Sequence, residues 1–329
     1  MNTAQAIAER APPNAEKVRA RCVASGRSSL MRLRPQAAWD FACRVTGRAQ
    51  RFRWGSIDCR RGRDLLFGSL TIDEAACQAP RRGTATVLQS ATERAYRELF
   101  HCIEAAGYPH LVRVWNYLPR INAIEGGIER YRQFNIARQE AFLAANRSLT
   151  GMVPGACALG SSAGSLTIGF LAARQPPRSL ENPRQVSAYH YPEDYGPRSP
   201  TFARAVLLDH APEPLLLISG TAAIVGHRSM HPGDVVAQTR ETITNLEAMI
   251  AAANEALGRP HFTHESLDYV VYLRSAQDLP AVTAELDAWL GVDTRCLFME
   301  ADICRRELLV EIEANGGPAI SGMVDGRHP

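Results

Sequence analysis

The sequence predicts an α+β fold made from two copies of one structural unit. Three observations support this: two long amphipathic segments, short apolar runs typical of strands on either side of them, and an order of elements that repeats after roughly 150 residues. Each copy follows the order β, α, β, α, β, β. This order favours strands of mixed direction with the helices gathered on one face of each sheet.

The first copy opens with an apolar strand at 65–69 and continues into a helix at about 88–106. One face of that helix is apolar over several turns, which is typical of a helix packed on a sheet. A β-rich run at 111–115 and a second helix near 128–146 follow, and two further strands close the copy.

The second copy repeats this order with a strand at 215–220 and a helix at about 235–252. Its second strand lies at 269–273 and its second helix at about 279–290, again followed by two strands. The chain therefore divides into an N-terminal degenerate unit at 1–62, a central domain with a linker at 63–200, and a C-terminal domain at 201–329.

Composition excludes several classes of protein. Apolar residues make up 46% of the chain and charged residues 22%, as in an ordinary globular protein. No apolar run reaches the length of about 18 residues that a membrane span needs, and basic residues alternate with acids, so we expect neither a membrane nor a nucleic-acid partner. The eight cysteines form no C-x-x-C pair, which favours reduced thiols and a cytoplasmic location.

Several short motifs together point to a known family. The second copy resembles the RidA/YjgF family of small trimeric α+β proteins in its strand at 218–221, its helix start at 235–240 and its last strand at 310–314. The fuller resemblance is to chorismatases, over roughly residues 60–329, in the motifs RVWNYLP (113–119), RYRQFNIAR (130–138), SGTA (219–222), GH (226–227), HPGD (231–234) and DIC (302–304).

This resemblance implies a fold and an activity. The fold would consist of fused RidA/YjgF-like (chorismate-mutase-like) units in a pseudo-threefold arrangement with a shortened N-terminal unit. A monomer that takes the place of a trimer is then one expectation. The activity would be conversion of chorismate to 3-hydroxybenzoate and pyruvate, without a metal or cofactor, in a site between the central and C-terminal units. Some relatives also release 4-hydroxybenzoate, so this product is kept open.

The last strand places Leu309, Glu311 and Glu313 on one face. The alternation by itself fits a solvent-exposed face. The resemblance instead aligns Glu311 with the general acid of chorismatases. Protonation of the enol-pyruvyl CH2 carbon requires a carboxyl that is still protonated near neutral pH, and hence one that is buried and close to negative groups.

Cys304 lies seven residues before Glu311, and we expect a hairpin through Arg305 and Arg306 to bring it back beside the Glu311 strand. A lone cysteine among apolar residues is typical of a small core residue. The resemblance implies instead that Cys304 takes the ring hydroxyl proton and directs the reaction to 3-hydroxybenzoate. A smaller residue at this position would give hydrolysis to a dihydroxy-cyclohexadiene acid.

The two substrate carboxylates require partners, and arginine binds them with a rigid two-pronged group. Arg295 matches the carboxylate-binding arginine of RidA-like proteins, and Arg204 is the second candidate. Tyr131, Asn135 and Arg138 share one helix face through their spacing, although that spacing also fits a solvated face. Gly220 and Thr221 are candidates for backbone N–H groups that bind an oxyanion.

Other signals favour different functions less well. The sequence GSSAG at 160–164 fits a G-x-S-x-G nucleophile elbow, but 165–171 reads as a strand where the elbow needs a helix. His227 and His231 have a spacing that could hold zinc on a helix, yet Pro232 and Gly233 place them in a loop. An imine deaminase of the RidA kind and a ligand-binding module remain the rival interpretations.

Overall fold

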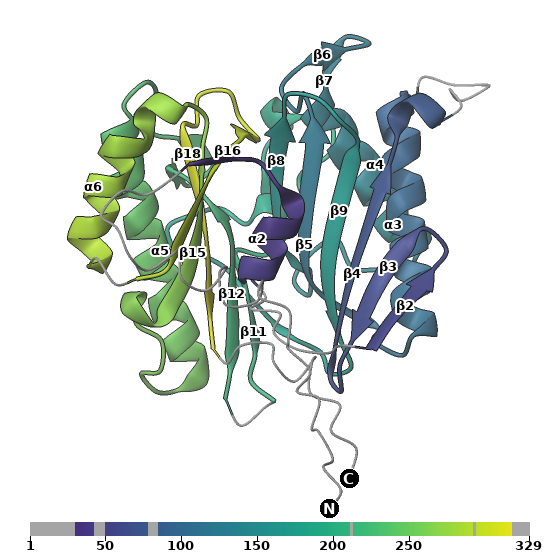
Figure 1. Cartoon of the computed structure of the whole chain (residues 1–329), viewed down its shortest axis with the longest axis horizontal. Coiled ribbons are helices and arrows are strands. Elements are labelled where there is room, and N and C mark those ends of the chain that lie inside the picture. Colours follow the sequence, from purple (N-terminus) through teal and green to yellow (C-terminus); the bar gives the residue numbers. More distant parts are fainter. Residues whose placement is uncertain (1–29, 43–49, 78–84, 211–212, 292–293, 318–329) are drawn as a thin grey trace, which may run out of the picture.

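Two seven-stranded sheets face each other in the computed structural model, and a pair of helices covers the outer face of each (Figure 1). The structure describes residues 30–42, 50–77, 85–210, 213–291 and 294–317. Within them the α+β class predicted from the sequence is confirmed.

The first sheet has the strand order β17-β8-β5-β9-β4-β3-β2. Its strands are β2 (Gln50–Trp54), β3 (Ile57–Arg61), β4 (Leu65–Ile72), β5 (His110–Pro119), β8 (Gly155–Ser161), β9 (Leu166–Ala173) and β17 (Asp302–Ile303). Helices α3 (Val87–Ala105) and α4 (Arg130–Ala144) cover it. A nucleophile elbow needs a helix directly after Ser162, but β9 directly follows β8. The nucleophile elbow is therefore excluded.

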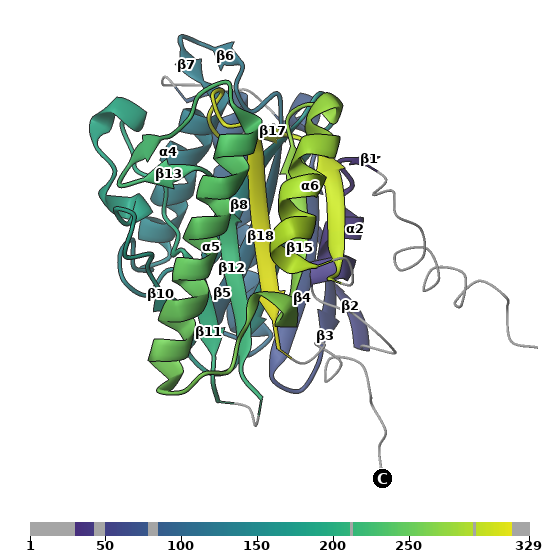
Figure 2. The same cartoon turned by 90° about the vertical axis from the view of Figure 1, so that its left-hand side faces the viewer.

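The second sheet has the order β1-β16-β15-β18-β12-β11-β10. Its strands are β1 (Met31–Arg32), β10 (Arg178–Leu180), β11 (Ala205–Leu208), β12 (Leu215–Thr221), β15 (Leu267–Leu273), β16 (Cys296–Glu300) and β18 (Val310–Gly316). Helices α5 (Val235–Leu257) and α6 (Leu279–Leu290) lie on its outer face, where Figure 2 shows them in front of β12, β18 and β15.

The internal repeat is confirmed by the topology. In the first sheet β4, β9, β5 and β8 are neighbours in that order, and β12, β18, β15 and β16 take the same places in the second. The parallel pairs β5–β8 and β15–β16 are each joined through a helix, as parallel neighbours require. All four long helices lie where the sequence predicts them.

Local sequence explains where these helices begin. Thr86 and Gln89 form a reciprocal capping box before α3, and the Asp234 side chain accepts the Ala237 N–H at the start of α5. Helix α5 ends at Gly258, whose φ of 68° is in the left-handed region that glycine tolerates. None of the described helices is long and apolar enough to cross a bilayer.

Each sheet has an apolar core under its helices, and a third apolar core fills the space between the two sheets. Helix α2 (Pro35–Ala42) adds Trp39 to this core, where its ring lies 5.5 Å from that of Phe67 and 6.1 Å from that of Tyr117. Residues 1–29 and 43–49 of the expected N-terminal unit lie outside the described residues. Its described strands extend the sheets of the other two units, since β2 and β3 continue from β4 and β1 pairs with β16. Pseudo-threefold symmetry stays a prediction.

The long connection between the units is ordered in its described part. It contains β10 and the short helices η2 (Ala188–His190) and η3 (Glu193–Tyr195), and it ends at Arg204 beside β11. Two small hairpins, β6–β7 (Ile124–Glu125 and Ile128–Glu129) and β13–β14 (Ile224–Val225 and Arg228–Ser229), complete the fold near one end of the sheets.

Candidate active site

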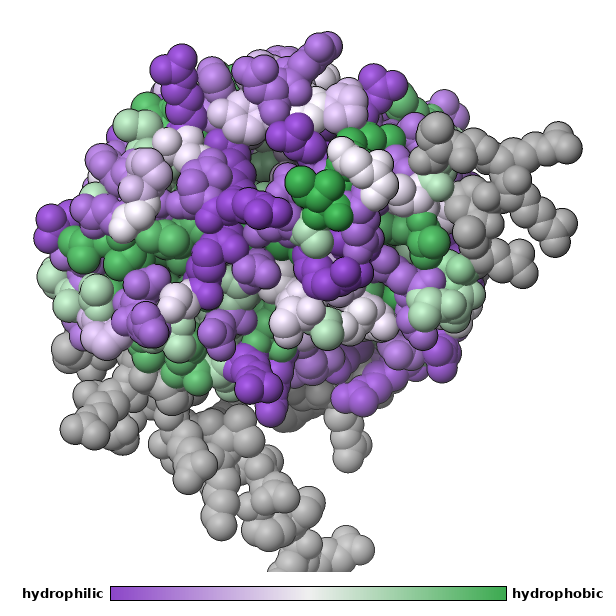
Figure 3. Space-filling model, turned by 90° about the horizontal axis from the view of Figure 1, so that it is seen from above, coloured by the Kyte–Doolittle hydropathy of each residue, from purple (hydrophilic) through white to green (hydrophobic). Residues whose placement is uncertain are grey.

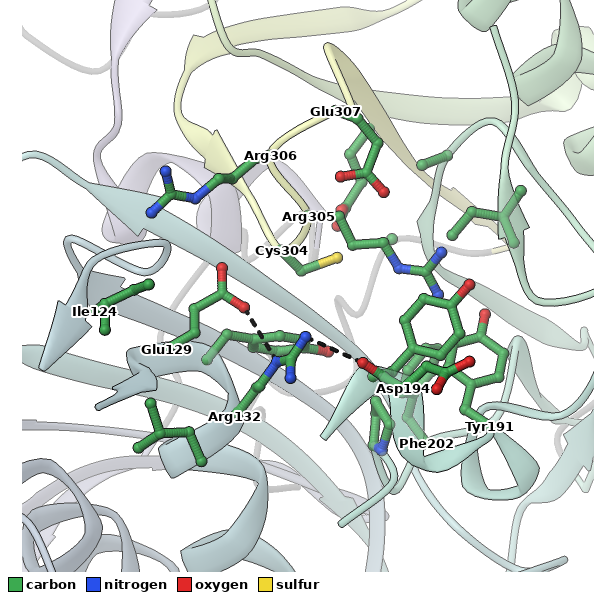
Figure 4. A pocket seen from close by; sticks show the side chains of 18 of the residues that line it. Ile124, Glu129, Arg132, Tyr191, Asp194, Phe202, Cys304, Arg305, Arg306 and Glu307 are labelled. Carbon is green, nitrogen blue, oxygen red and sulfur yellow. Dashed lines mark hydrogen bonds and ion pairs between the residues drawn. The ribbon is translucent and has the colours of Figure 1, made fainter. Parts of the chain in front are cut away.

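A cavity of about 500 Å³ lies where the two units meet. Residues from β18, the end of β12, the turn after β17, the β6–β7 hairpin, the start of α4 and the connection between the units line it. In Figure 4 the Cys304 thiol points into this space, between Arg305 on one side and Glu129 with Arg132 on the other. The position agrees with the expected site between the central and C-terminal units.

Glu311 forms part of the inner wall of the cavity. Its side chain is 3% exposed. Burial, followed by the negative charge of Glu313, raises the pKa of Glu311 to about 8, although Arg113, Arg204 and Arg274 act in the opposite direction. The Glu311 carboxyl is therefore protonated at neutral pH and can act as a proton donor.

Gly220 makes room for this carboxyl. A Cβ atom on residue 220 would lie 1.9 Å from Glu311 Oε1 and 3.1 Å from the Cβ of Cys157. The register between β12 and β18 shifts between Ile218 and Thr221, so Gly220 lies in a bulge opposite Glu311's strand. The sequence predicts Gly220 as an oxyanion donor, whereas its contacts point to close approach by a side chain.

Cys304 lies beside Glu311, as expected, but a hairpin does not bring it there. Strand β17 pairs with β8 of the first sheet rather than with β18. Burial and then the Glu311 charge raise the pKa of the Cys304 thiol to about 12. Cys304 is consequently a neutral thiol at the contact between the two sheets.

Arg274 and Gln238 hold the turn that presents Cys304. Arg274 follows β15 and donates to the carbonyl oxygens of Ile303, Arg305 and Leu308, and its Nη1 lies 2.7 Å from Asp302 Oδ1. The buried Gln238 of α5 donates to the carbonyl oxygen of Glu307 at 2.8 Å and accepts the N–H of Leu309 at 2.8 Å. The five bonds to backbone groups fix the chain on both sides of the thiol.

Tyr131 and Arg138 lie on the cavity side of α4. Burial is the main cause that raises the pKa of the Tyr131 hydroxyl. Behind it a smaller chamber of about 40 Å³ continues inward, lined by Glu311, Cys304 and Tyr131 together with Arg138 and Asn135. Arg138 Nε donates to the Tyr96 hydroxyl at 2.7 Å and Nη1 to the Thr201 carbonyl at 2.5 Å, whereas Nη2 has no hydrogen-bond partner among the described residues.

Arg204 reaches the cavity from the end of the connecting segment. It is buried, and its Nη2 donates to the Tyr191 hydroxyl at 2.6 Å and the Val186 carbonyl at 3.0 Å. The guanidinium also lies over the Phe202 ring, 5.1 Å from the centroid. The sequence ranks Arg204 second among the carboxylate-binding candidates, and the structure places it in the cavity wall.

The rim of the cavity is charged. Arg305 donates to the His227 carbonyl and stacks on Tyr195 at 4.0 Å, and Arg132 links Glu129 to the Asp194 carbonyl (Figure 4). The end of the molecule that holds the β6–β7 hairpin is mainly hydrophilic, with scattered apolar side chains (Figure 3). A charged small molecule can therefore approach this end from water.

Two predicted binding residues do not line the cavity. Arg295 immediately precedes β16 and pairs with Asp268 at 2.9 Å, and its side chain is 42% exposed. Because β16 and β15 are parallel, Arg295 lies level with the start of β15, whereas Glu311 is level with Tyr272 near the other end. Thr221 is buried, and its hydroxyl donates to the Ser219 carbonyl. The expected placement of Arg295 is corrected, and the backbone N–H role of Thr221 stays a prediction.

Two charged residues behind Glu311 are not among the site residues predicted from the sequence. Arg113 of β5 and Glu313 of β18 form an ion pair of 3.0 Å in which both side chains are fully buried. The signals were present, since Arg113 interrupts an otherwise apolar strand and Glu313 shares a strand face with Glu311. The solvent-exposed interpretation of that face is wrong.

Comparisons with known proteins show which family this chain belongs to. A family model described as "Chorismatase FkbO/Hyg5-like, N-terminal" matches residues 42–172. A 3-hydroxybenzoate synthase from Streptomyces hygroscopicus is 38% identical over 232 residues, which are 68% of this chain and 68% of the relative. This chain belongs to the chorismatase family. A chorismatase from Streptomyces rapamycinicus is 37% identical over 259 residues, 76% of this chain and 74% of that protein.

The likeness extends to the three-dimensional structure. A chorismatase crystal structure matches with a TM-score of 0.74 at 33% identity, covering 82% of this chain and 80% of that one. Neither unit alone makes up 82% of the chain, so the chorismatase match spans both units and their contact. The two units together therefore have the fold of that chorismatase.

Proposed function

We propose that this chain converts chorismate to 3-hydroxybenzoate and pyruvate. The observation that supports it best is Glu311, a buried carboxyl with a pKa of about 8 at the wall of a cavity of about 500 Å³. That volume suits a small molecule. The relatives named as chorismatases and as a 3-hydroxybenzoate synthase support the substrate and product.

In the first step Glu311 gives its proton to the terminal CH2 carbon of the enol-pyruvyl ether. The ether carbon becomes oxocarbenium-like, so the ether oxygen can leave the ring carbon and become the ketone oxygen of pyruvate. A side-chain acid works best when its pKa lies near the working pH, a condition that Glu311 meets.

In the second step the oxygen of the neighbouring ring hydroxyl, and not water, bonds to the ring carbon that carries the ether while the bond from that carbon to the ether oxygen breaks. The hydroxyl oxygen then releases its original ring carbon, and loss of one ring proton makes the ring aromatic. The carboxylate left on Glu311 can take up the proton released from the ring, so atoms balance without water: chorismic acid becomes hydroxybenzoic and pyruvic acids. Cys304, with a thiol pKa of about 12, is a poor proton acceptor. We therefore assign it the task of filling the space beside the ring that water would occupy, in place of the proton transfer expected from the resemblance.

The substrate carboxylates have two arginine partners in this proposal. Arg204 lies in the cavity wall, and Arg138 lines the inner chamber with Nη2 unpaired among the described residues. Both are buried, which strengthens their attraction for a carboxylate compared with an arginine in water. Tyr131, which lines both the cavity and the inner chamber, would orient the ring. Gly220 would act by admitting the Glu311 carboxyl.

The alternatives have less support. Hydrolysis to the dihydroxy-cyclohexadiene acid needs room for water where Cys304 stands. Chromatography of the products distinguishes 3-hydroxybenzoate from 4-hydroxybenzoate. The imine-deaminase interpretation depended on Arg295, which lies outside the cavity lining.

Incubation of the purified chain with chorismate, followed by chromatography, tests the proposal. We expect equal amounts of pyruvate and hydroxybenzoate. Glu311→Gln should lower the rate of pyruvate release by about 10³-fold, since general acids contribute roughly 10²–10⁴-fold. Its circular dichroism should match that of the unmodified protein. An unmodified protein that leaves chorismate unchanged, or a folded Glu311→Gln protein with full activity, would refute the proposal.

The pH dependence provides a second prediction. Because the protonated form of Glu311 is the reactive one, kcat/KM should be constant below about pH 8 and fall tenfold per unit above it. Initial rates between pH 6 and pH 9.5 measure this limb. A rate that rises through this range would instead indicate a carboxylate acting as base.

A further inference from the structure

A fully buried ion pair lies directly behind the proposed acid. Glu313 is two residues from Glu311 on the same face of β18, and Arg113 reaches it from β5 of the opposite sheet, with Nη2 3.0 Å from Glu313 Oε2. The Trp115 indole N–H also donates to Glu313 Oε2 at 2.9 Å. Each of these side chains is completely shielded from solvent.

Stability alone is a weak reason for such a pair. Removing two charges from water costs free energy that their attraction only partly returns, and apolar residues of similar volume are often at least as stable. The remainder of this interface is apolar, with Val112, Leu171, Leu217 and Val270 among its members. A pair of charges in this apolar contact, next to a titrating carboxyl, indicates a role other than stability.

We propose that Glu313 and Arg113 are positioning residues that set the charge state of Glu311 across the contact between the two sheets. The inference deepens the proposed function and rests on it. Glu313 acts through its negative charge, which disfavours a second carboxylate on the same strand face. Arg113 acts by pairing with Glu313 and holding it against the first sheet.

The other groups around Glu311 come from several elements. The charged ones are Arg204 before β11 and Arg274 after β15, both of which favour the carboxylate form. Arg305 lies on the turn after β17 and lines the same cavity. The neutral titratable groups are Cys157 of β8, Cys304, Tyr131 of α4 and Tyr272 of β15, each held in its protonated form by burial. Glu313 has the largest charge effect on Glu311, whereas Glu129 and Glu307 also line the cavity and Arg138 lines the inner chamber.

Removal of one of the two charges should move the pKa of Glu311 in a defined direction, which a purely structural role would not do. Glu313→Gln keeps the shape and can still accept the Trp115 N–H, but removes the negative charge and leaves Arg113 unbalanced. The alkaline limb of kcat/KM should then move to lower pH by about one unit, as expected for one charge at this spacing in a protein interior. Arg113→Met should move the limb to higher pH.

Loss of one partner can also prevent folding, because it leaves the other charge buried and alone. The double variant Arg113→Met/Glu313→Gln removes both charges and is expected to fold. Since Glu313 affects Glu311 more strongly than Arg113 does, the limb of the double variant should still move to lower pH, by about half a unit. Glu104→Gln, which breaks a remote pair with Arg147, is the matched control and should leave the limb in place.

A titration that needs no substrate separates this inference from the proposed function. Carboxyl ¹³C NMR of protein labelled in glutamate, with the Glu311 signal identified through Glu311→Gln, reports the midpoint directly. We expect lower midpoints in Glu313→Gln and in the double variant. A folded double variant with an unchanged midpoint, or variants that lose rate equally at every pH, would overturn the inference. A protein inactive on chorismate whose midpoint still moves would refute only the proposed function.

Discussion

At the level of single residues, the cavity depends on pairs in which one residue makes space for another. The carboxyl of Glu311 occupies the volume that a side chain on Gly220 would take, and Cys304 lines the same inner chamber. Burial then gives the two groups their protonation states, an acid with a pKa of about 8 and a thiol with a pKa of about 12. Small changes in side-chain volume should therefore change the chemistry.

Substitution of Cys304 tests the product. Cys304→Ala removes one sulfur atom and opens space for water beside the ring. We expect the product to shift from hydroxybenzoate toward the dihydroxy-cyclohexadiene acid, with pyruvate release lowered less than tenfold. Chromatography of the aromatic and non-aromatic acids measures the ratio. An unchanged ratio in the folded variant would show that Cys304 does not determine which product forms.

Substitution of Gly220 tests the fit of the acid. In Gly220→Ala the new Cβ displaces the Glu311 carboxyl, so kcat should fall by at least about tenfold, as expected when a reacting group moves by about 1 Å. Gly316→Ala is the matched control, because its Cβ would meet Leu267 at the other end of β18. The control should lower the melting temperature and leave kcat of the folded protein unchanged. Equal kcat in both variants would contradict this account.

At the level of elements, helix α5 does more than cover the second sheet. Gln238, one turn into the helix, is fully buried and bonds the backbone at His231, Glu307 and Leu309. The turn that presents Cys304 is therefore attached to the helix start as well as to Arg274. The conformation of the cavity wall should respond to changes on this helix.

Gln238→Leu tests this link between helix α5 and the turn that presents Cys304. It leaves buried backbone groups without partners, which should lower the free energy of unfolding by about 3 kcal/mol. Pyruvate release should fall about tenfold because Cys304 and Arg305 lose their fixed position. Asp234→Ala, which removes only the N-cap of the same helix, should cost about 1 kcal/mol and leave the rate unchanged. Chemical denaturation and initial rates measure both effects, and equal activities in the two variants would contradict the role of Gln238.

At the level of the whole molecule, each sheet includes a strand from a distant part of the chain. β1 comes from the N-terminal part and joins the second sheet, whereas β17 comes from the C-terminal unit and joins the first. The two sheets also share one apolar core that includes Trp39. We therefore expect the described part of the chain to unfold as one cooperative body.

Trp39→Ala tests this coupling. The large indole is almost fully buried, so its loss should lower the free energy of unfolding by about 4 kcal/mol. Unfolding should remain a single transition, followed by circular dichroism and by tryptophan fluorescence in parallel. Two separate transitions in the unmodified protein would show that the units are independent.

The sequence by itself determined the elements, their repeat, and the candidates Glu311, Cys304, Arg204, Tyr131, Arg138 and Gly220, all of which line the cavity or its inner chamber. Periodicity and motifs are local, and local patterns survive in a single sequence. Only the tertiary structure decided that Arg295 stays outside, that β17 joins the other sheet, and that Arg113 pairs with Glu313. These depend on contacts between residues up to 200 positions apart, whose burial and electric field no local pattern encodes.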